Sequence, residues 1–180
     1  GLGIPDFPVL FGRFASSLIG HGAPIILPKV SEQLDWEAEL VVVLSKGGKN
    51  IAEAEALDHV AGYSVFNDAS IRDYQLRSPQ WTAGKNFDDT GAFGPWLVTP
   101  DEVPAGAAGL KIECRVNGEV MQSSNTGNLI FTVANTIHLL STFMTLEAGD
   151  VIVMGTPGGV GVAGDPQIWM KDGDTCEIEE

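Results

Sequence analysis

The sequence predicts a β-rich α+β fold that occupies residues 1–180 as one domain. Short runs of β-branched and aromatic residues recur along the chain. Only residues 128–144 have the apolar spacing of a long helix. Strands and helices do not alternate as they would around a parallel sheet. A chain of 180 residues is long enough to bury a sizeable core.

Strand runs, turn residues and short helical spacings predict the elements of the first half of the chain. In chain order these are irregular structure with short strands (1–30), a Val-rich strand (35–44), a Gly-Gly turn (46–50), a short helix (51–60), a strand (61–70), a helical turn (70–77) and a long loop (78–95). Loops as long as the last one are often functional in compact domains.

The second half contains the clearest local pattern. Two alternating runs flank Asn117 and Gly118, which predicts a β-hairpin with a type I′ turn. The long helix that follows is expected to pack on a sheet with one apolar face, formed by Ile130, Val133, Ala134, Ile137, Leu140 and Met144. A strand at 150–155, a glycine-rich loop and a last strand at 174–180 complete the prediction.

Composition argues against several classes of function. The net charge is -14, with only 10 basic residues, and such a surface repels nucleic acid. No apolar run is long enough to span a membrane, so we expect no membrane partner. The two cysteines, Cys114 and Cys176, predict free thiols in a reducing compartment, the cytoplasm. The three histidines are far apart, so any metal is expected to be bound through oxygen.

Gly159, Gly161 and Gly164 match the G-x-G-x-x-G spacing of a dinucleotide-binding turn. That motif requires a helix directly after the glycines, because the helix N-terminus meets the pyrophosphate. Pro166 and the Gly-Asp turn at 173–174 leave no room for such a helix. No Gly-Lys-Ser/Thr is present either, so a P-loop is excluded. The glycines instead indicate a turn or a loop that approaches a ligand closely.

Glu37 and Glu39 are two residues apart in the predicted strand 35–44, so their side chains share one face. A solvated outer face is one explanation, since charged residues are mostly exposed. A metal site is the other, because like charges on one face are unfavourable unless a cation relieves them. Asp68 ends the next predicted strand and could add a third carboxylate. Three carboxylates suit Mg²⁺ or Mn²⁺.

Three further polar residues could bind an anion beside these carboxylates. If residues 69–76 are helical, Asp68, Arg72 and Gln75 share one side. Arg72 then forms either a surface ion pair with Asp68 or a bidentate anion clamp. Lys85, in the loop 78–95, is either a solvated charge or a second cation for a carboxylate or an enolate.

Five motifs in order resemble the fumarylacetoacetate hydrolase superfamily over nearly the whole chain. They are DWEAEL, AGYSVFNDASIRDYQ, WTAGKNFD with FGPWLVT, VNGEVMQSS and LEAGDVIVMGTPGGVG. The resemblance implies a mixed β-sandwich roll with few helices. It implies Glu37, Glu39 and Asp68 as ligands of Mg²⁺ or Mn²⁺, with Ca²⁺ as a possible substitute. It also implies a small anionic 2-oxo acid as substrate and a homodimer.

The same resemblance assigns roles to the remaining site residues. Arg72 and Lys85 become catalytic and substrate-binding residues, and Gln75 joins them in binding carboxylate and keto oxygens. Thr156 and Gly155 are expected to close over the substrate. The main function expected is metal-dependent cleavage of a C–C bond in acylpyruvate-type acids. The alternative is a decarboxylase or isomerase of 2-oxo dicarboxylic acids on the same site.

The chain departs from the superfamily pattern at three places. The N-terminal lid motif N-Y-x-x-H-x-x-E and the tail G-I-G-x-L-x-N are not found, so we expect the domain to lack both segments. His21 lies outside any such lid motif, which leaves the general base unassigned. Arg13 stands where the superfamily usually has lysine.

Overall fold

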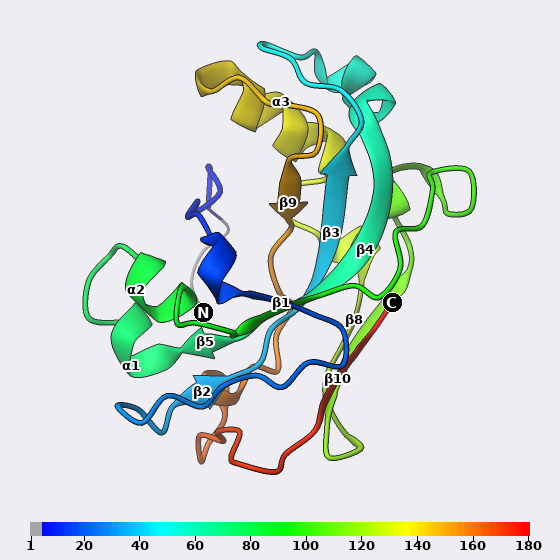
Figure 1. Cartoon of the computed structure of the whole chain (residues 1–180). Coiled ribbons are helices and arrows are strands. Elements are labelled where there is room, and N and C mark those ends of the chain that lie inside the picture. Colours follow the sequence, from blue (N-terminus) through cyan, green and yellow to red (C-terminus); the bar gives the residue numbers. More distant parts are fainter. Residues whose placement is uncertain (1–4) are drawn as a thin grey trace.

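The computed structural model describes residues 5–180 (Figure 1). The strands are β1 (Leu18–Gly20), β2 (Leu34–Asp35), β3 (Ala38–Leu44), β4 (Val60–Asp68), β5 (Ser70–Ile71), β6 (Gly91–Phe93), β7 (Lys111–Val116), β8 (Glu119–Asn125), β9 (Val151–Val153) and β10 (Cys176–Glu179). The α-helices are α1 (Arg72–Gln75), α2 (Thr82–Lys85) and α3 (Val133–Phe143), and 3₁₀ helices lie at Ala15–Ser17, Glu53–His59, Ala105–Ala107, Thr126–Asn128 and Gly161–Ala163. Strands outweigh α-helices, which confirms the predicted β-rich α+β class.

A five-stranded sheet in the order β1-β6-β4-β3-β9 forms the centre of the fold. Its two long strands, β3 and β4, pair antiparallel, with Ala38 opposite Asn67. β1 and β6 pair in parallel at one edge. A three-stranded sheet, β10-β7-β8, and the short pair β2-β5 lie beside it.

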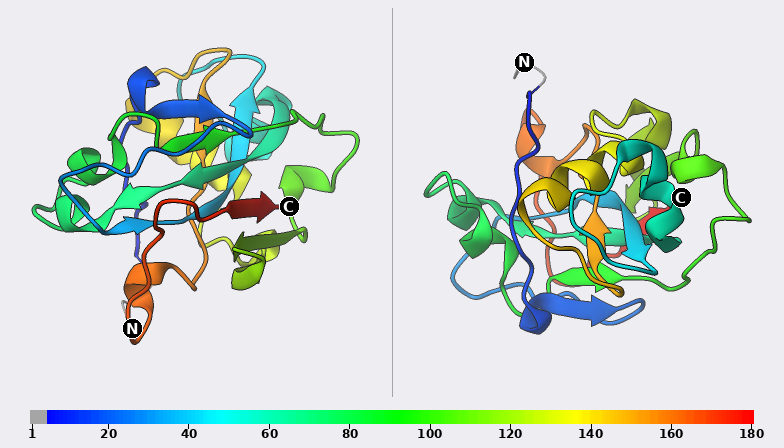
Figure 2. Two further views of the ribbon diagram at one scale, coloured as in Figure 1. Left: turned by 60° about the horizontal axis from the view of Figure 1, so that its bottom comes forward. Right: turned by 90° about the horizontal axis from the view of Figure 1, so that it is seen from above.

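Helix α3 covers one face of the five-stranded sheet (Figures 1 and 2). Val133, Ile137 and Leu140 are buried in the core formed with strand β3. The hydroxyl of Thr132 accepts a hydrogen bond from the Asn135 amide at 3.2 Å, so the helix begins later than the predicted residue 128. Ile130 therefore lies before the helix, and Met144 follows its last residue, Phe143. Both were predicted on the apolar face but are 59% and 40% exposed.

A second core lies between the short pair β2-β5 and the sheet β10-β7-β8. It contains Trp36, Ala38, Ile71, Ile112 and Cys114. Leu40 and Val42 of strand β3 belong instead to the core beneath α3. The segment around β3 therefore passes from one core to the other. Alternation along the strand then directs the intervening acidic side chains away from both cores.

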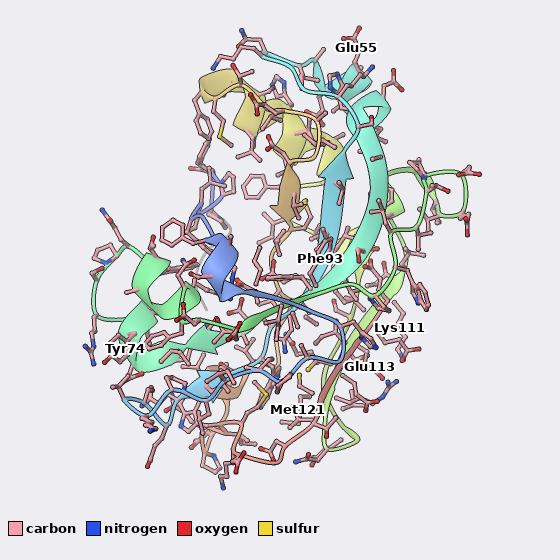
Figure 3. The ribbon with its side chains drawn as sticks, viewed as in Figure 1. Glu55, Tyr74, Phe93, Lys111, Glu113 and Met121 are labelled. Carbon is pink, nitrogen blue, oxygen red and sulfur yellow. The ribbon has the colours of Figure 1, made fainter. Side chains whose placement is uncertain are left out.

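The β7–β8 hairpin confirms the clearest sequence prediction. Asn117 and Gly118 have φ values of +53° and +80°, as a type I′ turn requires. Lys111 and Glu113 of β7, labelled in Figure 3, form an ion pair of 2.7 Å in which Lys111 is exposed and Glu113 is buried.

Other elements differ from the prediction. The predicted strand 35–44 is divided into β2 and β3, and the predicted helix 51–60 is a 3₁₀ helix, Glu53–His59. The predicted loop 78–95 contains α2 and β6. Four-residue helices and three-residue strands are too short to show a period, so tertiary contacts decide them. The rings of Tyr74 in α1 and Phe87 just after α2 pack edge to face, with their centroids 4.9 Å apart, and this contact holds the two helices together.

Cys114 and Cys176 are free thiols, as predicted, and their Sγ atoms lie 3.6 Å apart. Within residues 5–180, no helix has the length and apolar character needed to cross a membrane.

Candidate metal centre and substrate site

Three carboxylates, those of Glu37, Glu39 and Asp68, come together beside the paired strands β3 and β4. One oxygen from each side chain lies within 4.8 Å of the other two. The ladder explains this, because the Asp68 amide donates to the Glu37 carbonyl at 2.9 Å. The side chains are buried, with exposures of 6%, 4% and 1%. The alternative of a solvated outer face is therefore wrong.

Three basic side chains contact this carboxylate cluster, and two of them, Lys85 and Arg13, contact Asp68. The ammonium of Lys85 donates to Glu37 Oε2 at 2.8 Å and to Asp68 Oδ2 at 2.6 Å. Lys85 is buried, with its Nζ atom 5.1 Å from the centre of the Phe11 ring. Arg13 Nη1 donates to Asp68 Oδ1 at 2.5 Å. Lys85 is therefore not a solvated loop charge, and Arg13 contacts a candidate metal ligand directly.

The guanidinium of Arg72 occupies the other side of Glu37. Its Nε donates to Asp35 Oδ2 at 2.7 Å, and its Nη1 lies 2.6 Å from Glu37 Oε1 and 2.7 Å from Gln75 Oε1. The sequence predicted that Asp68 and Arg72 would share one side of a helix if residues 69–76 were helical. That prediction is wrong, because α1 begins only at Arg72. Arg72 and Gln75 do meet within that helix, as the spacing predicted.

Arg72 retains hydrogen-bonding capacity at its second terminal nitrogen. Nη2 is buried and has no partner among residues 5–180. Burial lowers the pKa of the guanidinium, but the carboxylates of Glu37 and Asp35 outweigh burial, and the pKa is raised. Arg72 is therefore a charged group with an unused buried donor, which suits an anionic oxygen.

The segment Gly155-Thr156-Pro157, called the GTP segment after its one-letter sequence, contacts Glu39 through its backbone and Ala38 through one hydroxyl. The Gly155 amide donates to Glu39 Oε2 at 2.5 Å. The Thr156 hydroxyl donates to the Ala38 carbonyl at 2.9 Å and accepts from Gln122 Nε2 at 2.9 Å. These bonds attach the segment to β3 and orient Glu39. Gly155 therefore contacts the carboxylate cluster, whereas the Thr156 hydroxyl is bonded to Ala38 and Gln122. Engagement of the hydroxyl within the protein was not expected from the sequence.

The carboxylate cluster has the chemistry of a divalent cation site. Burial, followed by the neighbouring charges of Asp68 and Glu37, raises the pKa of Glu39 well above its usual value. A bound cation relieves such crowding of like charges. Oxygen donors without sulfur or imidazole suit Mg²⁺ and Mn²⁺. The donor set therefore fits the ion that the sequence predicted.

Three supporting residues were missed by the sequence reasoning. Asp35 is fully buried and bonds to Arg72, Asn67 Oδ1 accepts from the Glu37 amide at 3.1 Å, and Gln122 Oε1 accepts from the Ala38 amide at 2.9 Å. For Asp35 a signal existed, because alternation places it on the same face as Glu37 and Glu39. Asn67 and Gln122 carry no comparable signal.

The glycines of the dinucleotide-like motif lead into only a three-residue 3₁₀ helix, Gly161–Ala163. Gly159 has a φ of +104°, and a Cβ there would lie 2.2 Å from the Met121 carbonyl oxygen. Gly161 is equally restricted, since a Cβ would lie 2.0 Å from the Ile168 carbonyl oxygen. Close backbone approach therefore accounts for these two glycines.

Comparison with known proteins identifies the class to which this fold and site belong. The family described as "Fumarylacetoacetate (FAA) hydrolase C-terminal" matches residues 2–180. The mitochondrial oxaloacetate tautomerase of Bos taurus is 49% identical over 98% of the chain and 57% of its own length. The corresponding protein of Xenopus laevis is 46% identical over 98% of the chain and 56% of its own length.

Solved structures give the same result. Fumarylacetoacetate hydrolase from Exiguobacterium antarcticum has a TM-score of 0.91 and 40% identity, over 95% of this chain and 61% of that one. Fumarylpyruvate hydrolase from Pseudomonas aeruginosa, in complex with Mn²⁺ and pyruvate, has a TM-score of 0.82 and 32% identity, over 94% and 72%. The chain belongs to the fumarylacetoacetate hydrolase family. It spans little more than half the length of the curated relatives it matches.

Proposed function

We propose that this chain catalyses metal-dependent tautomerisation of a 2-oxo dicarboxylic acid of the oxaloacetate type. The observation that carries the proposal is the position of Arg72. Its guanidinium, with a buried unpartnered Nη2, contacts Glu37 of the carboxylate cluster at 2.6 Å. The carboxylate cluster, which would hold the metal, thus lies beside a group that can bind an anion. An acid with a keto group and two carboxylates requires both kinds of group.

Glu37, Glu39 and Asp68 would hold the divalent ion, Mg²⁺ or Mn²⁺. When bound, such an ion supplies Lewis-acid stabilisation of negative charge on the substrate keto oxygen. Tautomerisation moves one proton between carbon and that oxygen and passes through an enolate, so stabilising this charge lowers the barrier.

The chain's own residues bind and orient the acid. Arg72 Nη2 donates to a substrate carboxylate, and the Gln75 amide next to it restricts the guanidinium plane. The ammonium of Lys85 lies between Glu37 and Asp68 and provides positive charge for the enolate oxygen. The Gly155 amide and the Thr156 hydroxyl hold Glu39 and β3 in place, so that the ligands are preorganised.

Two sets of relatives favour tautomerisation over the hydrolysis that was the main expectation. Curated relatives at 46% to 49% identity are named oxaloacetate tautomerases. A solved structure at 36% identity, with a TM-score of 0.88, is named 2-hydroxyhepta-2,4-diene-1,7-dioate isomerase, from Mycobacterium marinum. Hydrolysis of an acylpyruvate is the second candidate, because the Mn²⁺ and pyruvate complex belongs to a fumarylpyruvate hydrolase.

Parallel assays test the two candidates. The enol-to-keto conversion of oxaloacetate is followed by ultraviolet absorbance, and pyruvate release from fumarylpyruvate is followed in a second assay, each with Mn²⁺ and with a chelator. We expect rapid metal-dependent conversion of oxaloacetate and little pyruvate. Pyruvate release alone would favour the second candidate, and inactivity in both assays would overturn the proposal.

A matched pair of variants assigns the activity to the site. Glu37→Ala is expected to lower turnover by more than about 100-fold. Loss of a residue that only supports a metal ligand typically costs less than this, so the size of the effect identifies Glu37 as a ligand itself. Glu55→Ala is the control, since Glu55 is an exposed carboxylate at the opposite end of the molecule from Tyr74 (Figure 3). Equal turnover of the two variants would contradict the assignment.

A further inference from the structure

Asp35 is a fully buried carboxylate with an unusual number of strong donors. It ends the short strand β2, one residue before Trp36, and its exposure is 0%. Oδ1 accepts from the amides of Trp36 at 2.9 Å and Gly161 at 2.7 Å. Oδ2 accepts from Arg72 Nε at 2.7 Å and from the Val162 amide at 2.9 Å. Both oxygens are therefore fully engaged.

We propose that Asp35 is a positioning residue that fixes the Arg72 guanidinium against the glycine segment 159–164 so that Nη2 stays available for the substrate carboxylate. The inference rests on the proposed function, because that function assigns Arg72 to substrate binding. Asp35 has no direct role in the chemistry. It acts through Arg72, whose Nε it binds at 2.7 Å.

The distribution of partners around the guanidinium supports this role. Asp35 takes Nε, whereas Glu37 and Gln75 take Nη1. Among the guanidinium nitrogens, these bonds leave only Nη2 without a partner in the described part of the chain. An arginine held at Nε loses less freedom when it binds an anion, so binding becomes tighter.

The glycine segment provides the counterpart that holds Asp35. Two consecutive amides, of Gly161 and Val162, donate to its carboxylate at 2.7 and 2.9 Å. Such paired amides form an anion-binding concavity in many phosphate sites. Here the anion is a side chain of the same protein. A Cβ at position 161 would lie 2.8 Å from Asp35 Oδ1, so a glycine is needed for this approach.

Burial makes the arrangement costly to disturb. A carboxylate removed from water loses its solvation, which is strongly unfavourable unless donors replace the water. Asp35 has one cationic donor and three amide donors. Removing its charge would release Arg72 Nε and two loop amides at once. The Arg72 side chain would then gain freedom. The candidate metal ligands would keep their other partners, which are Lys85, Arg13 and the Gly155 amide.

The experiment compares Asp35→Asn with wild type in two titrations. Mn²⁺ affinity is measured first, and then the affinity of the Mn²⁺-loaded protein for malate, a dicarboxylate that cannot tautomerise. We expect the malate dissociation constant to rise at least about 10-fold, while the Mn²⁺ dissociation constant changes less than about threefold. The KM for oxaloacetate should rise more than kcat falls. Equal malate affinity in wild type and variant would overturn the inference.

Two additions separate positioning from a merely structural role. In an Arg72→Lys background, Asp35→Asn should cause no further loss of malate affinity, because the residue through which it acts is gone. Asp174→Asn is the matched control, since Asp174 also accepts from a backbone amide, that of Lys171 at 2.7 Å, in a turn far along the chain. This control should leave both affinities unchanged. An additive loss in the double variant would contradict the proposal.

A measurement on the wild-type protein keeps the inference testable if Asp35→Asn does not fold. Hydrogen exchange should show the Arg72 Nε proton and the Gly161 and Val162 amides protected before malate is added. Rapid exchange at these three positions would overturn the inference. Failure of the wild type to bind Mn²⁺ or malate would instead overturn the proposed function, so the two outcomes are distinct.

Discussion

The ammonium of Lys85 lies 2.6 Å from the carboxylate of Asp68, and both side chains are almost completely buried. The same ammonium lies 2.8 Å from Glu37. One lysine thus links a residue that precedes β3 to the residue that ends β4. It compensates part of the charge of the carboxylate cluster, which would otherwise be repulsive in a buried environment.

Replacing this lysine is expected to destabilise the metal-free protein. Lys85→Met leaves two buried carboxylates with one cationic partner each, Arg72 and Arg13. We expect the free energy of unfolding in urea to fall by at least about 2 kcal/mol. Lys46→Met removes the same charge from an exposed turn and should change stability by no more than about 0.5 kcal/mol. Similar losses in both variants would show that Lys85 is not needed to balance the cluster.

Neighbouring glycines provide a second test, based on space and backbone conformation. Gly159→Ala places a Cβ 2.2 Å from the Met121 carbonyl oxygen at a φ of +104°, whereas a Cβ at Gly158 meets nothing within 4 Å. The first substitution should lower the unfolding free energy by about 1–3 kcal/mol or more, and the second should be nearly neutral. Thermal or urea unfolding of the two variants gives the comparison. Equal stability would contradict the close approach of this segment to β8.

Part of the fold and site follows from local sequence. The Asn117-Gly118 turn requires φ above zero at two positions, and few residue pairs supply it. Alternation alone places Glu37 and Glu39 on one face, because a strand offers only two faces. The buried stripe of α3 is predictable from its helical apolar spacing, although its start depends on the Thr132 cap.

The remainder depends on contacts between distant segments. Lys85 is placed by α2, a helix of one turn with no readable period. Arg72 pairs with Asp35 and Glu37 rather than with its sequence neighbour Asp68, because β2 and β5 pair and bring these residues together. The break between β2 and β3 likewise lies next to Asp35. The partners of Asp35 are the amides of residues 161 and 162, which are distant in the sequence, so local sequence does not predict the break.

Gln122 is expected to hold the GTP segment against β3. Its amide nitrogen donates to the Thr156 hydroxyl at 2.9 Å and to the Pro157 carbonyl at 2.8 Å, and its oxygen accepts from the Ala38 amide. Gln122→Leu removes the partner of the Thr156 hydroxyl, the Pro157 carbonyl and the Ala38 amide. Each of these groups that is left buried without a hydrogen bond lowers the free energy of unfolding by about 1–3 kcal/mol. Hydrogen exchange at the Gly155 amide should therefore accelerate.

A surface glutamine gives the control for that experiment. Gln167 is exposed and donates to the Val162 carbonyl at 2.9 Å. Gln167→Leu should leave exchange at Gly155 unchanged. If both variants exchange alike, Gln122 does not anchor the GTP segment.

Binding of Mn²⁺ should stabilise the folded protein, because the unfolded chain does not assemble the three carboxylates. At 100 times the dissociation constant the gain is about 2.7 kcal/mol. For a chain of this size that corresponds to a rise of about 5–10 °C in Tm. A chelator should reverse the rise. A Tm that does not respond to Mn²⁺ would contradict binding to the native state.

The most direct test of the account is a Mn²⁺ titration of wild type and Glu39→Gln, with free Mn²⁺ measured by electron paramagnetic resonance. Glu39 is chosen because glutamine keeps its shape while removing one ligand charge. Wild type should bind one Mn²⁺ per chain, and Glu39→Gln should bind it at least about 30-fold more weakly. Glu55→Gln should match wild type. Equal Mn²⁺ affinity in wild type and Glu39→Gln would contradict the assignment of Glu37, Glu39 and Asp68 as the metal ligands.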